Sequence, residues 1–309
     1  MQQPTDQQPL RGVIVPILTP LTPDEAVDVA SLRRLVNFLV DNGVHGIWAA
    51  GTTGEFAALD EDARRLVIET VAEESAGRVP VIGNVSAPAT SAAARAAAAL
   101  RDCPLDGVAA TPPYYFSHSQ AELRDHFRAV GERCHHPLWV YNIPSTVKLT
   151  VEPATIAELA SDGTVVGVKD SSGAGEAFAQ LAMLCRHRGL DLYRFVGSVW
   201  RITMAGIDAH GVIPGIANLV PRSVAAAWEA GARGDGAAAL RHHGEMLAAT
   251  RATQLGHGGG IHASSFSGLK AALKLLGIIE HDTVSAPLRP LSDEEKSHLP
   301  PLLKKLGLC

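Results

Sequence analysis

The chain has 309 residues, of which 46% are hydrophobic and 19% are charged, and its formal net charge at neutral pH is −5. This length suits one large α/β barrel or two ordinary domains, with enough apolar content for a sizeable core. A mildly acidic chain without a basic run is not expected to bind nucleic acid.

The first ten residues, 1–10, are expected to form a short disordered lead-in. They lack the basic start and apolar core of a signal peptide. No apolar run reaches the length of a membrane span, so we expect no membrane association. The four cysteines form no CxxC pair and have no metal-ligand spacing, which favours a reduced, cytoplasmic compartment.

From residue 11 onward, short apolar runs alternate with amphipathic stretches. Strands are expected at residues 12–17, 44–49, 79–85, 107–111, 137–143, 164–169, 192–197 and 210–213. Helices are expected at residues 29–41, 61–76, 91–102, 120–134, 153–160, 175–188, 199–207 and 222–232. Eight such units predict an α/β fold of parallel strands, a TIM (β/α)8 barrel over residues 11–235. An open doubly wound sheet would normally show a glycine-rich turn after its first strand, and none follows here.

After the eighth unit the pattern changes to helices without strands. Residues 236–277 and 292–306 have helical patterns, and a glycine-rich link, Gly256-His-Gly-Gly-Gly-Ile-His262, interrupts the first stretch. We expect residues 236–309 to form a C-terminal helical appendage to the barrel and not a separate catalytic domain.

Lys169 ends a nearly unbroken apolar strand, Thr164-Val-Val-Gly-Val-Lys169. Side chains alternate along a strand, so Gly167 shares the face of Lys169 and is expected to leave open space beside the amine. Apolar surroundings lower the pKa of a lysine, and a neutral amine can form a Schiff base with a ketone. On this stretch alone, a strand-end lysine that reaches solvent is an equally good interpretation.

The ends of other strands also hold candidate functional residues, because in such a barrel the reactive groups lie on the loops after the strands. Gly51-Thr-Thr-Gly-Glu55 can hold a carboxylate through hydroxyls and backbone N–H groups, although an ordinary glycine turn would look the same. Tyr141 can transfer protons if its neighbours lower its pKa, although a core tyrosine is commoner.

Two further loops and the histidines complete the candidates. Thr111-Pro-Pro-Tyr-Tyr-Phe116 carries paired tyrosines suited to an interface, and Gly211-Val-Ile-Pro-Gly-Ile-Ala-Asn218 has small residues that leave room for a ligand. The histidine pairs at 135–136 and 242–243 are adjacent in sequence and point to different sides of a helix, and no HExxH motif occurs. We therefore expect no metal site.

From about residue 11 to about residue 303, the chain resembles the dihydrodipicolinate synthase / N-acetylneuraminate lyase family of pyruvate-dependent class I aldolases. The resemblance rests on Gly51-Thr-Thr-Gly-Glu55, Tyr141-Asn-Ile-Pro144 and Gly167-Val-Lys-Asp-Ser171, which occur in the family's order and spacing. It implies a TIM barrel with a C-terminal helical region and a homotetramer, a dimer of dimers.

The resemblance also implies roles for single residues. Lys169 would form the Schiff base with pyruvate or a 2-keto acid, with no metal or organic cofactor. Tyr141 would be the proton donor and acceptor, with Thr53 and Tyr115 as its relay and Tyr115 reaching in from a neighbouring subunit. Ile213 would contribute its backbone carbonyl. The predicted substrate-binding residues are Gly51, Thr52, Thr53, Thr146, Ile213 and Gly215.

One departure from the family bears on the substrate. Dihydrodipicolinate synthases usually carry an arginine where this chain has Thr146, and that arginine holds the carboxylate of aspartate semialdehyde. Lys148 is a possible substitute as a point charge. We therefore predict a lyase that cleaves a 2-keto-3-deoxy sugar acid, or a related 4-hydroxy-2-keto acid, to pyruvate and an aldehyde.

Two alternatives stay open, and a third is disfavoured. One is 4-hydroxy-tetrahydrodipicolinate (dihydrodipicolinate) synthase, which condenses pyruvate with aspartate semialdehyde. Another is a keto-deoxy sugar acid dehydratase, which would use the same Schiff base to eliminate water. A silent keto-acid-binding regulator is disfavoured, because binding alone needs no reactive amine at Lys169.

Overall fold

The computed structural model describes residues 10–197 and 208–308. Most of the predicted lead-in and the predicted helix at residues 199–207 lie outside the described residues. Among the described residues, no helix is long and apolar enough to cross a membrane.

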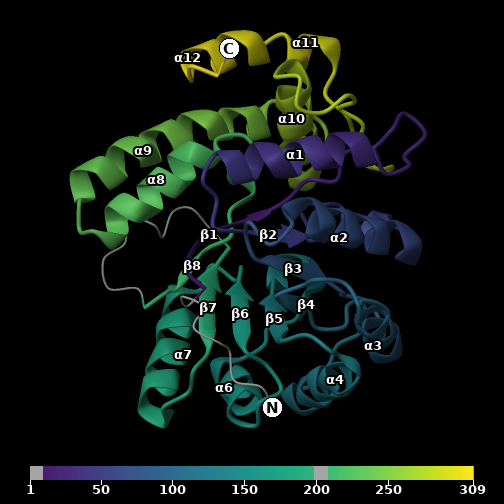
Figure 1. Ribbon diagram of the computed structural model, residues 1–309, viewed down its shortest axis with the longest axis vertical. Coiled ribbons are helices and arrows are strands. Elements are labelled where there is room, and N and C mark those ends of the chain that lie inside the picture. Colours follow the sequence, from purple (N-terminus) through teal and green to yellow (C-terminus); the bar gives the residue numbers. More distant parts are fainter. Residues whose placement is uncertain (1–9, 198–207, 309) are drawn as a thin grey trace.

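Eight parallel strands close into a barrel in chain order, with β1 paired to both β2 and β8 (Figure 1). This confirms the predicted TIM barrel. All eight predicted strands are present and shorter than predicted, although β6 ends one residue later than expected, at Asp170. The strands are β1 Gly12–Pro16, β2 Gly46–Ala49, β3 Val81–Asn84, β4 Gly107–Ala110, β5 Leu138–Asn142, β6 Gly167–Asp170, β7 Tyr193–Val196 and β8 Gly211–Val212.

Helices surround the barrel because each carries one apolar stripe that must be buried against the strands. In α1, Leu32, Leu35, Val36 and Leu39 form that stripe. The helices of the barrel are α1 Val29–Asp41, α2 Glu61–Ser75, α3 Thr90–Ala99, α4 Gln120–Arg133, α5 Pro144–Val147, α6 Pro153–Ser161, α7 Gly175–Arg188 and α8 Pro221–Ala232. The single turn α5 was not predicted, because four residues are too short to show a helical period.

Helix starts follow local capping chemistry. The side chain of Asp60 accepts a hydrogen bond from the Ala63 backbone N–H at the start of α2. Ser119 and Glu122 form a reciprocal capping box at the start of α4, as their spacing predicts. These contacts set where the two helices begin.

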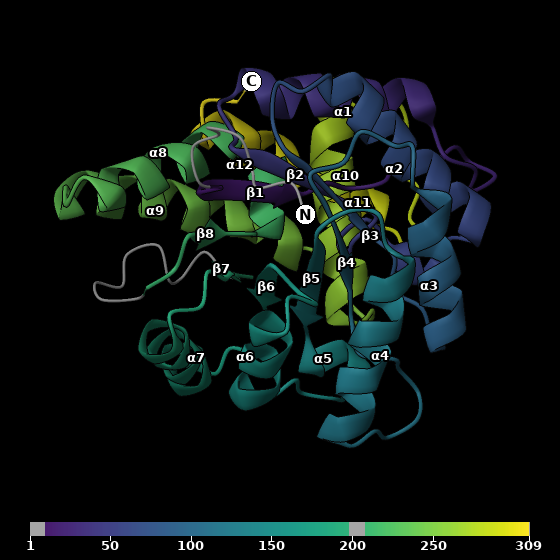
Figure 2. The same ribbon diagram turned by 60° about the horizontal axis from the view of Figure 1, so that its bottom comes forward.

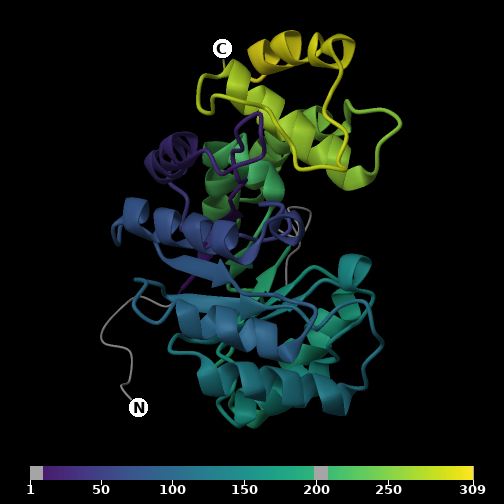
Figure 3. The same cartoon turned by 90° about the vertical axis from the view of Figure 1, so that its right-hand side faces the viewer.

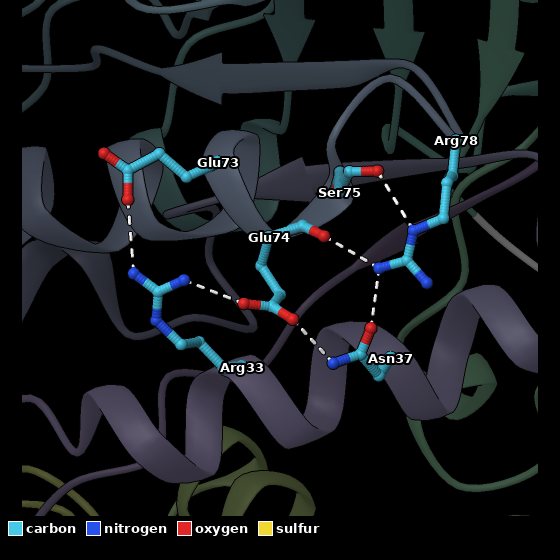
Figure 4. Close-up of polar contacts among 6 residues, drawn as sticks. All are labelled: Arg33, Asn37, Glu73, Glu74, Ser75 and Arg78. Atoms are coloured by element: carbon cyan, nitrogen blue, oxygen red, sulfur yellow. Dashed lines mark hydrogen bonds and ion pairs between the residues drawn. The ribbon is translucent and has the colours of Figure 1, made fainter.

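On the outside of the barrel, a polar network joins α1 to α2 and the turn after it (Figure 4). The Arg33 guanidinium bridges two neighbouring glutamates, and the nearer carboxylate lies 2.8 Å away. Exposed pairs of this kind each contribute about 0–1 kcal/mol to stability, so the network aligns two helices that the apolar core already holds. Its members are Arg33, Asn37, Glu73, Glu74, Ser75 and Arg78.

The C-terminal region is helical, as predicted, and gathers at the end of the molecule opposite α4 and α6 (Figures 1 and 3). Its longer helices are α9 and α10, and α9 packs against α8. Figure 2 shows α10 extending towards α5, and both helices line the same cavity. The α-helices of this region are α9 Gly236–Ala249, α10 Ile261–Leu275, α11 Asp293–Lys296 and α12 Leu299–Lys305.

Candidate active site

Lys169 projects from β6 into an aromatic environment inside the barrel. Its side chain is almost fully buried, and its Nζ lies 4.0 Å from the ring centroid of Tyr141 and 4.9 Å from that of Trp48. Burial lowers the pKa of Lys169 to about 7, because the charged amine loses its hydration. The lysine therefore does not reach solvent, and near neutral pH much of it is a free amine.

Tyr141 stands beside Lys169 because β5 and β6 pair in register at these two residues. Its hydroxyl lies 3.1 Å from Thr52 Oγ1. Burial raises the pKa of Tyr141 to about 12, although its hydrogen bonds with Thr52 and Ser171 oppose the shift. The neighbours therefore do not produce the lowered pKa that proton transfer was expected to need. At neutral pH the phenol is protonated and can donate to a developing oxyanion.

The loop after β2 brings Thr52 to the phenol. It closes as a tight turn in which the Glu55 N–H donates to the Thr52 carbonyl at 3.0 Å. Thr19 Oγ1 donates to the Gly54 carbonyl at 2.7 Å and holds the turn against the end of β1. Thr53, the next residue, faces Gly215 instead: a Cβ placed on that glycine would lie 3.4 Å from Thr53 Oγ1.

A cavity of about 430 Å³ opens from Thr52 towards the C-terminal region. Thr146 on α5 lines one side of it, and the Thr146 hydroxyl donates to the Ile143 carbonyl at 3.1 Å. Most of the wall is apolar, and it includes Phe56, Tyr114, Phe266 and Leu288. The cavity therefore begins at Thr52, the residue whose hydroxyl contacts that of Tyr141.

The model of the dihydrodipicolinate synthetase family matches residues 9–306. The chain belongs to this family. Its members are pyruvate-dependent class I aldolases, so the protein is a lyase-type enzyme.

Individual relatives agree with this assignment. The 4-hydroxy-tetrahydrodipicolinate synthase of Pelobacter propionicus is 33% identical over 303 residues, covering 96% of this chain and 99% of the relative. That of Methylococcus capsulatus is 37% identical over 231 residues, covering 74% and 78%. The solved structure of dihydrodipicolinate synthase from Bacteroides thetaiotaomicron has a TM-score of 0.89 at 31% identity, covering 96% and 99%.

Two sequence-based expectations for this family site are revised by the geometry. The hydroxyl next to Tyr141 is that of Thr52, whereas Thr53 was predicted as its relay partner. Thr52 and Thr53 are consecutive residues of a tight turn, and the Thr53 hydroxyl lies towards Gly215. Gly167 does not leave open space beside the amine either: a Cβ there would lie 2.5 Å from the Trp139 indole, which fills that space.

Three other predicted residues lie around the same centre. Ile213 belongs to the buried cluster inside the barrel that also contains Trp48 and Tyr141. Gly51 lies against Trp48, because a Cβ there would meet the indole Cδ1 at 2.9 Å. Gly215 faces Thr53, as described above. The ends of β2, β5, β6 and β8 therefore meet around Tyr141 and Lys169.

Tyr115 does not approach Tyr141 within one chain. Its side chain is 91% exposed, its ring contacts that of Phe116, and its φ of 90° is unusual for a residue with a side chain. The role of Tyr115 in a neighbouring subunit stays a prediction.

The contribution of the C-terminal region was missed. Phe266 of α10 and residues 285–288 form part of the cavity wall, whereas the region was expected to be a plain appendage. No pattern in the sequence marks this contact, because it depends on how α10 packs against the barrel. Within residues 10–197 and 208–308, no group of three or more His, Cys, Asp or Glu side chains is arranged to hold a metal ion.

Proposed function

We propose that this enzyme forms a Schiff base between Lys169 and pyruvate and joins the resulting enamine to an aldehyde. The observation that carries this proposal is the buried amine of Lys169, with a pKa of about 7, set 4.0 Å from the ring of Tyr141. An amine with an ordinary pKa would be almost entirely protonated at neutral pH and could not attack a ketone.

The steps follow from these groups. The neutral amine of Lys169 adds to the C2 carbonyl of pyruvate, and the carbinolamine loses water to give an iminium. Loss of a C3 proton gives the enamine, whose C3 attacks the aldehyde carbon and forms the new carbon–carbon bond. The Tyr141 phenol donates its proton to the alkoxide that results. Water then hydrolyses the iminium and frees Lys169, and cleavage runs through the same steps in reverse.

The carboxylate of pyruvate needs donors near this centre. We propose that Thr53 and the backbone N–H groups of the Gly51–Glu55 loop bind it, while Thr52 shares a proton with Tyr141. Gly215 supports this role, since its missing side chain leaves the Thr53 hydroxyl uncovered. No metal ion or organic cofactor takes part in these steps.

For the aldehyde, the relatives favour aspartate semialdehyde. Those reported above are 4-hydroxy-tetrahydrodipicolinate synthases at 33% and 37% identity. This supports the synthase over the sugar acid lyase that Thr146 led us to predict. A cation for the carboxylate is available in Lys148, which lines a neighbouring cavity together with Thr146. The sugar acid lyase stays the second candidate, on the strength of the uncharged Thr146.

We expect aspartate semialdehyde to exceed glyceraldehyde at least tenfold in kcat/KM when each is tested with pyruvate. Lys148→Met should raise the KM for aspartate semialdehyde about tenfold and leave the KM for pyruvate unchanged, because one charge-assisted contact contributes about 1.5–3 kcal/mol. Steady-state kinetics with product analysis by mass spectrometry measures both. A glyceraldehyde preference of tenfold or more would establish the lyase instead.

We also propose a homotetramer in which Tyr115 completes the site of a neighbouring subunit. The support is the exposed aromatic pair of Tyr115 and Phe116, together with the positive φ of Tyr115, which residues with a side chain rarely adopt. We expect Tyr115→Phe and Tyr141→Phe each to lose most turnover, and mixed assemblies of the two variants to regain part of it. If Tyr115 acted within its own chain or not at all, mixing would restore nothing. Sedimentation velocity of both variants checks that assembly is unchanged.

A further inference from the structure

A buried ion pair joins the loop after β2 to helix α10. Lys270 Nζ lies 2.5 Å from Glu55 Oε1, and the two side chains are 0% and 1% exposed. The second carboxylate oxygen of Glu55 accepts hydrogen bonds from the backbone N–H and the hydroxyl of Ser285, at 2.7 and 2.6 Å. Lys270 also donates to the Thr283 carbonyl at 2.7 Å. Both charges therefore have more than one partner, and the contacts of Glu55 join segments more than 200 positions apart in the chain.

Stability alone does not account for such a pair. Removing two charges from water costs free energy that their attraction often fails to offset, so apolar residues of the same size would frequently be as stable. Burial lowers the pKa of Lys270, and the carboxylate of Glu55 opposes that shift. The contribution of the ion pair is structural specificity, because it fixes the relative position of the two segments that carry the charges.

On the barrel side, the pair fixes the loop that carries the catalytic hydroxyls. Glu55 has a φ of 59°, and its N–H closes the turn onto the Thr52 carbonyl. Holding the Glu55 side chain therefore holds the turn that presents Thr52 to Tyr141. Phe56, the next residue, lines the cavity, so its position depends on the same anchor.

On the C-terminal side, the pair fixes the opposite wall of the cavity. Phe266 lies one helical turn before Lys270, on the same face of α10, and lines the cavity. Ser285, which donates to Glu55, begins the segment 285–288 that lines it as well. The ion pair between Glu55 and Lys270 therefore fixes the position of the walls on both sides of the cavity.

We propose that Glu55 and Lys270 are positioning residues for the proposed aldolase reaction. Their ion pair holds the loop 51–55 in position beside Tyr141. Helix α10 is therefore required for the geometry of the active site. This inference rests on the proposed function and adds to it a requirement for the C-terminal region.

The test compares Lys270→Met, Glu55→Gln and the double variant with a matched control, Lys274→Met. Lys274 lies one turn further along α10 and forms an exposed pair with Asp282 at 2.9 Å. We expect each single variant to lower kcat/KM for pyruvate about 10- to 100-fold per active site, because small misplacements of catalytic groups have effects of this size. The control should stay within twofold of the wild type. Ser285→Ala, which leaves both charges paired, should give a smaller loss of about threefold.

The double variant separates positioning from stability. Each single variant leaves one buried charge unpaired, whereas the double variant leaves none. The double variant should therefore regain most of the melting temperature that the single variants lose, while its kcat/KM stays low. Titration of active sites with pyruvate and borohydride counts the folded enzyme. A double variant that regains kcat/KM along with stability, or single variants and Ser285→Ala within twofold of wild-type kcat/KM per titrated site, would overturn the proposal. Failure of the wild type to form the adduct would instead reject the proposed function.

Discussion

Reduction with borohydride in the presence of pyruvate is expected to fix one pyruvyl group on Lys169. Lys169→Ala is expected to lose both this adduct and turnover, by at least about 10⁴-fold, or about 5.4 kcal/mol at 1.36 kcal/mol per tenfold. The reason is that no other amine in the described structure combines burial with contact to Tyr141 and Trp48. Peptide mapping by mass spectrometry locates the label.

Two other lysines serve as internal controls for this experiment. Lys148 is exposed near the cavity, and Lys270 is buried but paired with Glu55. Neither is expected to be labelled, because the first keeps its hydration and the second is held by a carboxylate. A label on Lys148 in place of Lys169, or no label at all, would contradict the mechanism.

The same experiment has a defined pH dependence. Burial lowers the pKa of Lys169 to about 7 from its ordinary 10.5, so the protonated, unreactive form dominates only below about pH 7. The rate of adduct formation should rise about tenfold per pH unit below 7 and level off above it. A rate that keeps rising to pH 10 would show that the lysine is hydrated in solution.

The barrel was predictable because its signals are local and repeated. Each apolar run is short and bounded by an amphipathic stretch, and eight repeats of that unit leave little freedom of topology. The same pattern made Lys169 and Tyr141 candidates, since each lies near the end of a buried strand, and the family resemblance supplied their predicted roles. Residues at equivalent ends of parallel strands must meet at one rim, and the β5–β6 register brings these two side by side.

What the sequence did not predict depends on packing between distant segments. The choice between Thr52 and Thr53 follows from how one tight turn is oriented, and the two residues are chemically identical. Gly167 makes room for Trp139, and its strand carries no sign of which neighbour fills the space. The role of α10 arises from its contact with Glu55, which lies more than 200 positions earlier in the chain. Contacts of this kind depend on the packing of distant segments and leave no local pattern in the sequence.

Tyr141→Phe is expected to separate Schiff-base formation from the later proton transfer. The ring would stay against Trp48, with 5.5 Å between centroids, so the surroundings of Lys169 would persist and the borohydride adduct should still form. Turnover should fall about 10²–10⁴-fold, the usual effect of a lost general acid, because Tyr141 is the phenol beside Lys169. Comparison of single-turnover trapping with steady-state kcat measures the two steps separately.

The adjacent threonines then test which hydroxyl serves the phenol. Thr52→Val removes the group 3.1 Å from the Tyr141 hydroxyl and should lower kcat while adduct formation continues. Thr53→Val removes the hydroxyl beside Gly215 and should raise the KM for pyruvate instead. Unchanged turnover in Tyr141→Phe would reduce the tyrosine to a packing role. The reverse pattern in the two threonine variants would show that Thr53 is the relay partner, as the sequence predicted.

Burial raises the pKa of Tyr141 to about 12, so the phenol keeps its proton at every pH near neutrality. This proton is transferred only when an alkoxide forms beside it.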